Sequence, residues 1–243
     1  MRILNFAKRN IKELLRDPLG LVFTILLPLF LLFIFQQFNI PNEAYKLENF
    51  TPGIVIFSFS FITLFTSTLI ARDRESSLLI RLGVSPMKSY EYILGYMLSL
   101  IPMILIQNVL FFALAIILGL KFTIYVVFAI LASLVVSILF MGIGILFGSM
   151  LKEKAASGIS SVIVQLVCFT SGMYFSKDIV GKGFATICSI LPFEGALNII
   201  KAVLNNDYSI LTLNNIVIFS LYTIVILILS IIVFNKKMTS DNR

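Results

Sequence analysis

The chain has 243 residues, of which 59% are apolar, and its mean hydropathy is +1.02. This composition excludes a soluble globular domain and indicates a polytopic membrane protein. The net charge of +7 does not indicate nucleic-acid binding, because the basic residues gather in alternate loops, as is typical of membrane topology. Since a span needs about 20 mostly apolar residues, we expect an all-α protein of about six spans in a single transmembrane domain, residues 1–243.

Residues 1–17 predict an amphipathic helix at the membrane surface. At about 100° per residue, the apolar face carries Ile3, Leu4, Ala7, Ile11, Leu14 and Leu15. The basic face carries Lys8, Arg9, Lys12 and Arg16. We expect the basic face to bind anionic lipid of the cytoplasmic leaflet. The alternative is a simple charged anchor for the first span.

Six apolar segments have the length of membrane spans, at about residues 19–38, 52–71, 90–118, 122–147, 156–175 and 213–234. Gly144 and Gly148 predict close packing of the fourth span against another helix. Tyrosines at one end of the third span predict an aromatic belt, formed by Tyr90, Tyr92 and Tyr96. Polar residues within the spans predict interhelical hydrogen bonds, with substrate contact as the alternative, at Gln107, Asn108 and Gln165.

Residues 176–211 hold two shorter apolar pieces that meet at Pro192. Each piece is about a dozen residues, or about 18 Å of helix, and is too short to cross alone. A continuous span would bury Glu194 and Lys201 at about 2.5–3.5 kcal/mol per charge, so we expect a re-entrant or interfacial helical pair on the extracellular side. Six spans then place both termini in the cytoplasm, together with 14 of the 19 Lys and Arg residues.

Residues 72–91, the densest charged run, lie in a cytoplasmic loop between the second and third spans. Ser76 and Ser77 can cap a short helix, and Gly83 and Pro86 can end it. Its apolar face would consist of Leu78, Leu79 and Leu82. An apolar helix face flanked by charges fits a groove on a partner protein; the alternative is an ordinary topogenic loop.

Enzymatic chemistry is not indicated in this chain. The phosphate-binding motif Gly-x-x-x-x-Gly-Lys-[Ser/Thr] does not occur, and the sequence contains no His. Cys168 and Cys188 lack the spacing of metal ligands, so we expect no cofactor or metal in this chain. A transporter of this composition must therefore obtain its energy from another subunit or need none.

Two stretches resemble a known family. Asp73, Arg74 and Glu75 precede Leu79, Arg81 and Leu82, and Ser85-Pro86 ends the loop. Residues 171–175, Ser-Gly-Met-Tyr-Phe, precede Leu191-Pro192-Phe193. With the amphipathic helix and six spans, this layout resembles the membrane (permease) subunit of a type-2 ATP-binding-cassette (ABC) exporter over essentially the whole chain.

The resemblance implies that the loop couples the permease to an ATPase subunit through Asp73, Arg74, Glu75, Leu78, Leu79, Arg81 and Leu82. It implies two ATPase copies, which would hold ATP and Mg, and a second permease subunit in the cytoplasmic membrane. Residues around the hinge would form an extracellular gate, Pro192, Phe193 and Glu194. The apolar spans favour export of an amphipathic or apolar substrate, such as a drug, an antimicrobial peptide or a lipid-linked molecule. The alternatives are an ATPase-independent channel and an ion-gradient-driven carrier.

Overall fold

The computed structural model describes residues 2–38, 40–76, 88–173 and 181–241, with side chains described as far as residue 237. These residues form helices and connecting turns and no strand, which confirms the expected all-α polytopic membrane fold. The longer helices are α1 (Arg2–Leu15), α3 (Leu27–Gln37), α4 (Leu47–Glu75), α6 (Ser89–Ile117), α7 (Ile124–Met150), α8 (Glu153–Thr170), α10 (Lys182–Ile190), α11 (Pro192–Asn205) and α12 (Leu213–Asp241). The short elements are α2 (Pro18–Leu21), η1 (Val22–Leu26), η2 (Glu43–Tyr45) and η3 (Tyr208–Ile210).

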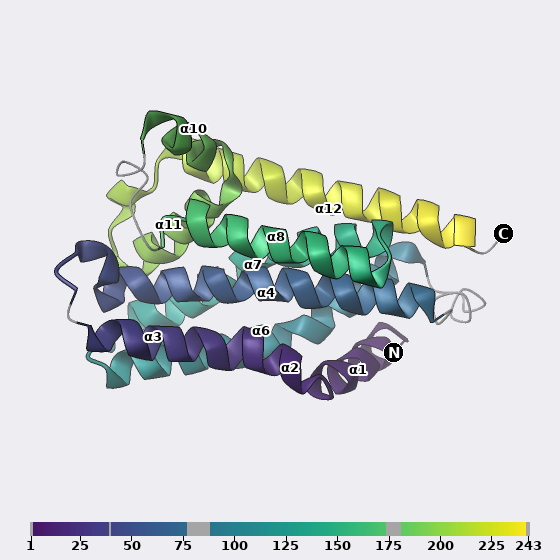
Figure 1. The fold of residues 1–243 in the computed structure, drawn as a ribbon, viewed down its shortest axis with the longest axis horizontal. Coiled ribbons are helices and arrows are strands. Elements are labelled where there is room, and N and C mark those ends of the chain that lie inside the picture. Colours follow the sequence, from purple (N-terminus) through teal and green to yellow (C-terminus); the bar gives the residue numbers. More distant parts are fainter. Residues whose placement is uncertain (1, 39, 77–87, 174–180, 242–243) are drawn as a thin grey trace.

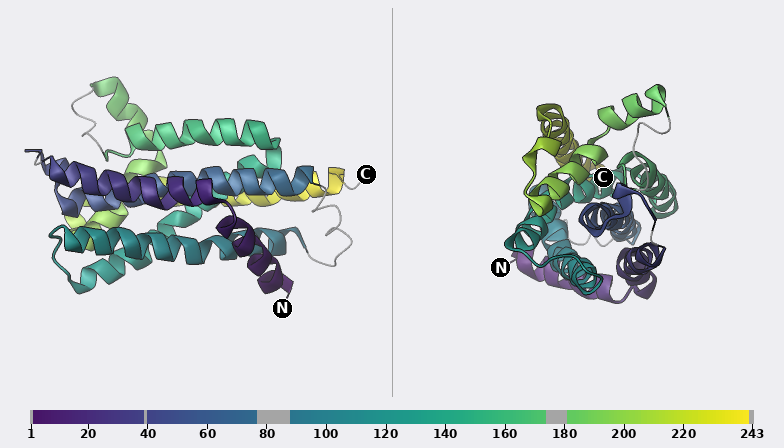
Figure 2. Two further views of the ribbon diagram at one scale, coloured as in Figure 1. Left: turned by 60° about the horizontal axis from the view of Figure 1, so that its bottom comes forward. Right: turned by 90° about the vertical axis from the view of Figure 1, so that its left-hand side faces the viewer.

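The long helices form an elongated bundle around α4 (Figures 1 and 2). In the most apolar stretch of α4, 83% of the residues are buried within the bundle, whereas in that of the peripheral helix α12 only 11% are buried. The N-terminal helix, the end of α4 and the end of α12 lie at the same end of the bundle, which we call the terminal end; α10 lies at the other, the distal end. An alternation of Phe, Ser and Thr along α4 suits a helix surrounded by others, because its hydroxyls bond to backbone carbonyls.

Glycines bring α7 close to α4, as the sequence predicts. A Cβ atom at Gly144 would lie 2.6 Å from Cβ of Thr66, and one at Gly148 would lie 2.6 Å from the carbonyl oxygen of Ser67. Thr63 then reaches across and donates a hydrogen bond of 2.9 Å to the carbonyl of Phe140. The spacing of four residues therefore places two glycines on the one face of α7 that contacts α4.

The chain turns from α1 into the first span at Asp17 and Pro18. Asp17 accepts a hydrogen bond of 3.0 Å from the backbone N–H of Gly20, and Pro18 occupies the first position of α2. The same helical run contains a π-helical turn, η1, which ends two residues before Pro28. Since proline cannot donate to the carbonyl four residues earlier, the wider turn accommodates it without breaking the helix.

Five helical segments among the described residues are long and apolar enough to cross a membrane: Pro18–Gln37, Leu47–Glu75, Ser89–Ile117, Ile124–Met150 and Leu213–Lys237. The expected fifth span, residues 156–175, corresponds to α8 as far as Thr170, and over its 18 residues α8 is less apolar than these five segments, with Glu153 and Lys154 in its first turn. Helix α8 nevertheless runs alongside α4. Arg72 of α4 forms an ion pair with Glu153 at the start of α8, and farther along the two helices Ser67 and Ser160 share a hydrogen bond of 2.7 Å. The chain after α8 reaches Gly53 through Met173. Helix α8 is thus less apolar than a lipid-surrounded span but lies where a span would.

Helices α10 and α11 meet at the expected hinge, with an angle of 76° between them. Pro192 opens α11 at its first position, and the ring of Phe193 lies 6.0 Å from that of Phe140, well inside α7. The N-terminus of α11 therefore enters the bundle between α4, α7 and α12, whereas α10 is largely exposed. Neither helix alone has the length of a span.

Candidate functional site

The end of α4, immediately before residues 77–87, is held by a buried charge cluster. Asp73 is 1% exposed, and its two carboxylate oxygens accept hydrogen bonds of 2.7 and 2.8 Å from the guanidinium of Arg9 on α1. The hydroxyl of Tyr96 on α6 donates a third hydrogen bond to Asp73, of 2.7 Å. Bidentate, charge-assisted bonds of this kind fix orientation as well as distance. The cluster therefore joins α1, α4 and α6.

Glu13 forms a second ion pair with Arg9, one turn along α1. Burial tends to lower the pKa of Arg9, but the hydrogen bonds and charge of Asp73 outweigh it, and the pKa is raised. Burial and then the negative charge of Asp73 raise the pKa of Glu13, although Arg9 opposes them. Arg9 therefore bridges two carboxylates, with two hydrogen bonds to Asp73 and an ion pair with Glu13.

The neighbours of Asp73 bind α7 and α8. Arg72 forms an ion pair of 2.9 Å with Glu153 at the start of α8. Arg74 donates hydrogen bonds of 3.1 and 3.3 Å to the carbonyls of Gly148 and Leu151, where α7 ends. The last carbonyls of a helix have no hydrogen-bond donor within the helix, so an arginine placed there donates the missing hydrogen bonds. Residues 72–74 thus fix the end of α4 to three other helices besides α6.

The start of α6 is fixed as well. The backbone N–H of Lys88 donates a hydrogen bond of 2.7 Å to the carboxylate of Glu91, which caps the helix. Ser89 donates a bond of 2.8 Å to Asn235 near the end of α12. Both ends of the segment 72–91 are therefore anchored in the bundle. Of the residues expected to couple, the structure places Asp73, Arg74 and Glu75; Leu78, Leu79, Arg81 and Leu82 lie outside the described residues.

Two tyrosines expected in an aromatic belt are instead buried. Tyr92 and Tyr96 are 0% exposed, and their rings pack edge-on against Phe6 of α1 at 5.4 and 5.0 Å. Gly95 makes room for this ring, since a Cβ atom there would lie 2.5 Å from Phe6. The belt prediction was wrong for these two tyrosines, because α1 covers the face of α6 that carries them. Tyr90 is 47% exposed.

Sequence reasoning missed the roles of Tyr96 and Glu153. It assigned Arg9 to the membrane surface together with Lys8, Lys12 and Arg16, whereas the structure joins Arg9 to Asp73. A usable signal was the single aspartate between two arginines at the end of a long apolar helix, a carboxylate that needs a cation from elsewhere in the fold.

An apolar cavity of about 500 Å³ opens between η1, α4 and α8. Its lining includes Phe23, Phe57, Phe61 and Val164 together with Gln165. The two other polar residues of the spans form the interhelical hydrogen bonds that were expected, Gln107 to Ser58 and Asn108 to Ser133. Gln165 differs from them because its side chain is exposed beside this cavity.

These features define a multi-pass, all-helical membrane protein whose polar chemistry gathers where α4 ends. The model of the family described as "ABC-2 type transporter" matches residues 2–205, and the chain belongs to that family. It is the membrane (permease) component of an ABC transporter and not the ATPase, and its family implies an ATPase partner. No curated protein sequence matches the chain as a relative.

Proposed function

We propose that this permease subunit works as half of an exporter, paired with an identical or similar permease and driven by two separate ATPase subunits that hold ATP and Mg. Both termini and residues 72–91 then face the cytoplasm, and the protein resides in the cytoplasmic membrane. The observation that carries the proposal is the anchoring of both ends of that segment to α1, α7, α8 and α12. A segment anchored in this way transmits force from a docked partner to several helices together.

The apolar cavity supports an amphipathic or apolar substrate. Its aromatic and aliphatic lining offers surface for apolar groups, and Gln165 offers one hydrogen-bonding group beside them. Phe193 packs against Phe140 within the bundle, and this contact supports an extracellular gate at Pro192, Phe193 and Glu194. Rotation of α11 at its hinge would separate the two rings and open a path outward.

The outer face of α8 supports a second permease subunit. Gly158, Ser161 and Gln165 are exposed along this helix, and a Cβ atom at Gly158 would meet nothing within 4 Å. Small and polar residues that face hydrocarbon gain little, whereas they favour close packing and hydrogen bonding with another helix. The same requirement accounts for the low apolarity of α8. Anionic lipid is a further expected partner, at α1.

Co-purification tests the coupling proposal. The chain extracted in mild detergent should retain a subunit with the phosphate-binding motif, and the complex should hydrolyse ATP. Leu79→Asp with Leu82→Asp should lower the retained amount of that subunit at least tenfold, because charges would enter an apolar contact. The same change at the distal end, Ile210→Asp with Leu211→Asp, is the matched control and should leave retention intact.

Equal retention by both double variants would contradict docking at residues 72–91. Transport that survives depletion of ATP and collapses with an ionophore would instead favour an ion-gradient carrier. Transport that needs neither would favour a channel.

A further inference from the structure

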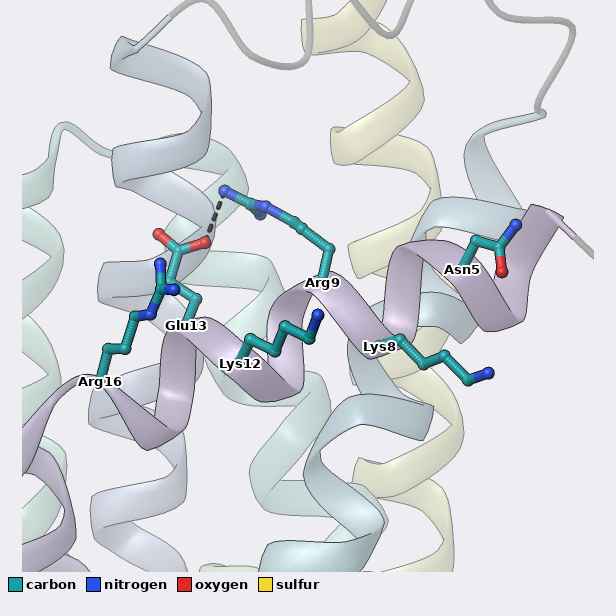
Figure 3. A pocket seen from close by; sticks show the side chains of 6 residues that line it. All are labelled: Asn5, Lys8, Arg9, Lys12, Glu13 and Arg16. Atoms are coloured by element: carbon teal, nitrogen blue, oxygen red, sulfur yellow. Dashed lines mark ion pairs between the residues drawn. The ribbon is translucent and has the colours of Figure 1, made fainter.

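A groove of about 740 Å³ runs along α1 and is lined by Asn5, Lys8, Arg9, Lys12, Glu13 and Arg16 (Figure 3). All six side chains come from this one helix, and four are cations against a single carboxylate. Figure 3 shows Arg9 extended toward Glu13, while Lys8 projects away from that pair. The groove therefore has two parts: the ion pair of Arg9 and Glu13, whose charges neutralise each other, and a basic part, which we call the basic remainder.

The basic remainder consists of Lys8, Lys12 and Arg16. None of these three forms an ion pair with any described residue, and all three are exposed. They are spaced four residues apart, so they lie above one another on the same face, about 6 Å apart along the helix axis. Arg9 does not add to this charge, because Asp73 and Glu13 already neutralise it. The groove thus presents three cations in a row to a ligand.

An exposed apolar stripe lies beside the three cations. Leu4 and Leu15 are 59% and 63% exposed, and Ile11, which is half-buried, lies on the same side of the helical wheel and between them along the helix axis. The remaining face of α1 is buried, with Phe6 packed against α6. Helix α1 therefore has three faces, one against the bundle, one apolar and uncovered, and one basic and uncovered.

We propose that the groove binds the phosphate headgroup of an anionic glycerophospholipid, whose acyl chains cover Leu4, Ile11 and Leu15. The proposal rests on the proposed position of α1 at the cytoplasmic membrane surface. A lipid satisfies the basic and the apolar faces together, whereas a free phosphate ester satisfies only the basic one. An acidic protein surface would likewise leave the leucines in water. Because Arg9 ties α1 to Asp73, a bound lipid also bears on the segment 72–91.

Lipid retention by the full chain tests the proposal. The purified chain in mild detergent receives dioleoyl phosphatidylglycerol, and native mass spectrometry measures the bound fraction against lipid concentration. Lys8→Gln, Lys12→Gln and Arg16→Gln together should weaken retention about a hundredfold, at about fivefold per cation. The matched control removes three other basic residues of the terminal end, Lys154→Gln, Lys236→Gln and Lys237→Gln, and should change retention less than threefold. The single variant Lys12→Gln should give an intermediate loss.

Two further arms identify the ligand. Phosphatidylcholine should bind at least tenfold more weakly than phosphatidylglycerol. Glycerol 3-phosphate at roughly 10 mM, a concentration high enough to occupy a site that recognises the phosphate alone, should not displace the lipid. Equal loss in the groove and control variants would overturn the proposal in favour of diffuse electrostatic attraction. Displacement by glycerol phosphate would overturn it in favour of a soluble phosphate site. A triple variant that keeps its lipid would also overturn the proposal.

The measurement contains neither ATPase nor transport substrate. A failure of the export proposal therefore leaves the lipid result standing, and a negative lipid result leaves the pairing with an ATPase untouched. Thermal unfolding of each variant, measured without added lipid, confirms that loss of retention does not reflect loss of the fold.

Discussion

The buried pair of Arg9 and Asp73 yields the sharpest prediction. Arg9→Gln leaves the carboxylate of Asp73, 1% exposed, with Tyr96 as its remaining partner among the described residues. Removing one partner of a buried ion pair costs about 3–5 kcal/mol. Because the side chain of Arg9 is 36% exposed, water screens part of the loss, and we expect the lower end, about 3 kcal/mol.

The matched control is Lys8→Gln, which removes the same charge from the adjacent residue of α1, where no ion pair with a described residue is lost. At about 2–4 °C per kcal/mol for a chain of this size, Arg9→Gln should lower Tm by about 6–12 °C, and Lys8→Gln by less than about 2 °C. A thiol-reactive dye reports unfolding, since Cys188 is buried in the fold. Equal Tm values for the two variants would refute the reasoning.

Three further predictions concern the packing and charge of the helices. Gly148→Ala should destabilise by about 1–3 kcal/mol, because its Cβ would lie 2.6 Å from a backbone oxygen of Ser67, whereas Gly158→Ala, in open space, should keep or raise Tm. Gly158→Leu should leave monomer Tm unchanged but abolish cross-linked permease dimers; persisting dimers would place the interface elsewhere. Glu13→Gln should be tolerated at neutral pH and flatten the pH dependence of Tm. The raised pKa makes protonated Glu13 stabilising below its unfolded pKa, and this contribution is lost as pH rises through the folded value. A steep loss of Tm in that variant at pH 7 would contradict this sign.

Much of the fold could be predicted because membrane helices follow composition and spacing. Apolar runs locate α4, α6, α7 and α12, since hydrocarbon tolerates few other segments. The proline between two short apolar pieces locates the hinge at Pro192, because a proline opens a helix and cannot continue one. Gly144 and Gly148 identify the packing face of α7, since their spacing repeats with the helix.

The partners of the charged and aromatic residues could not be predicted, because they depend on where separate helices meet. Arg9 lies on the polar side of α1 in any helical wheel, and only the position of the end of α4 gives it Asp73. A tyrosine near the end of a span looks the same whether it faces headgroups or another helix, so Tyr96 was assigned to the wrong surroundings. Helix α8 was expected to be an ordinary span, and the sequence did not show that its polar residues Ser161 and Gln165 are exposed on the outside of this chain.

Cross-linking at the end of α4 tests the central proposal most directly. Ser76 is exposed and is the last described residue before residues 77–87, whereas Ser209 is exposed at the distal end. A cysteine at either position, treated with a short bifunctional reagent in native membranes, should capture its neighbour. We predict that Ser76→Cys captures a subunit that carries the phosphate-binding motif and that Ser209→Cys does not. Capture of that subunit at neither position, or equally at both, would contradict docking of an ATPase at residues 72–91.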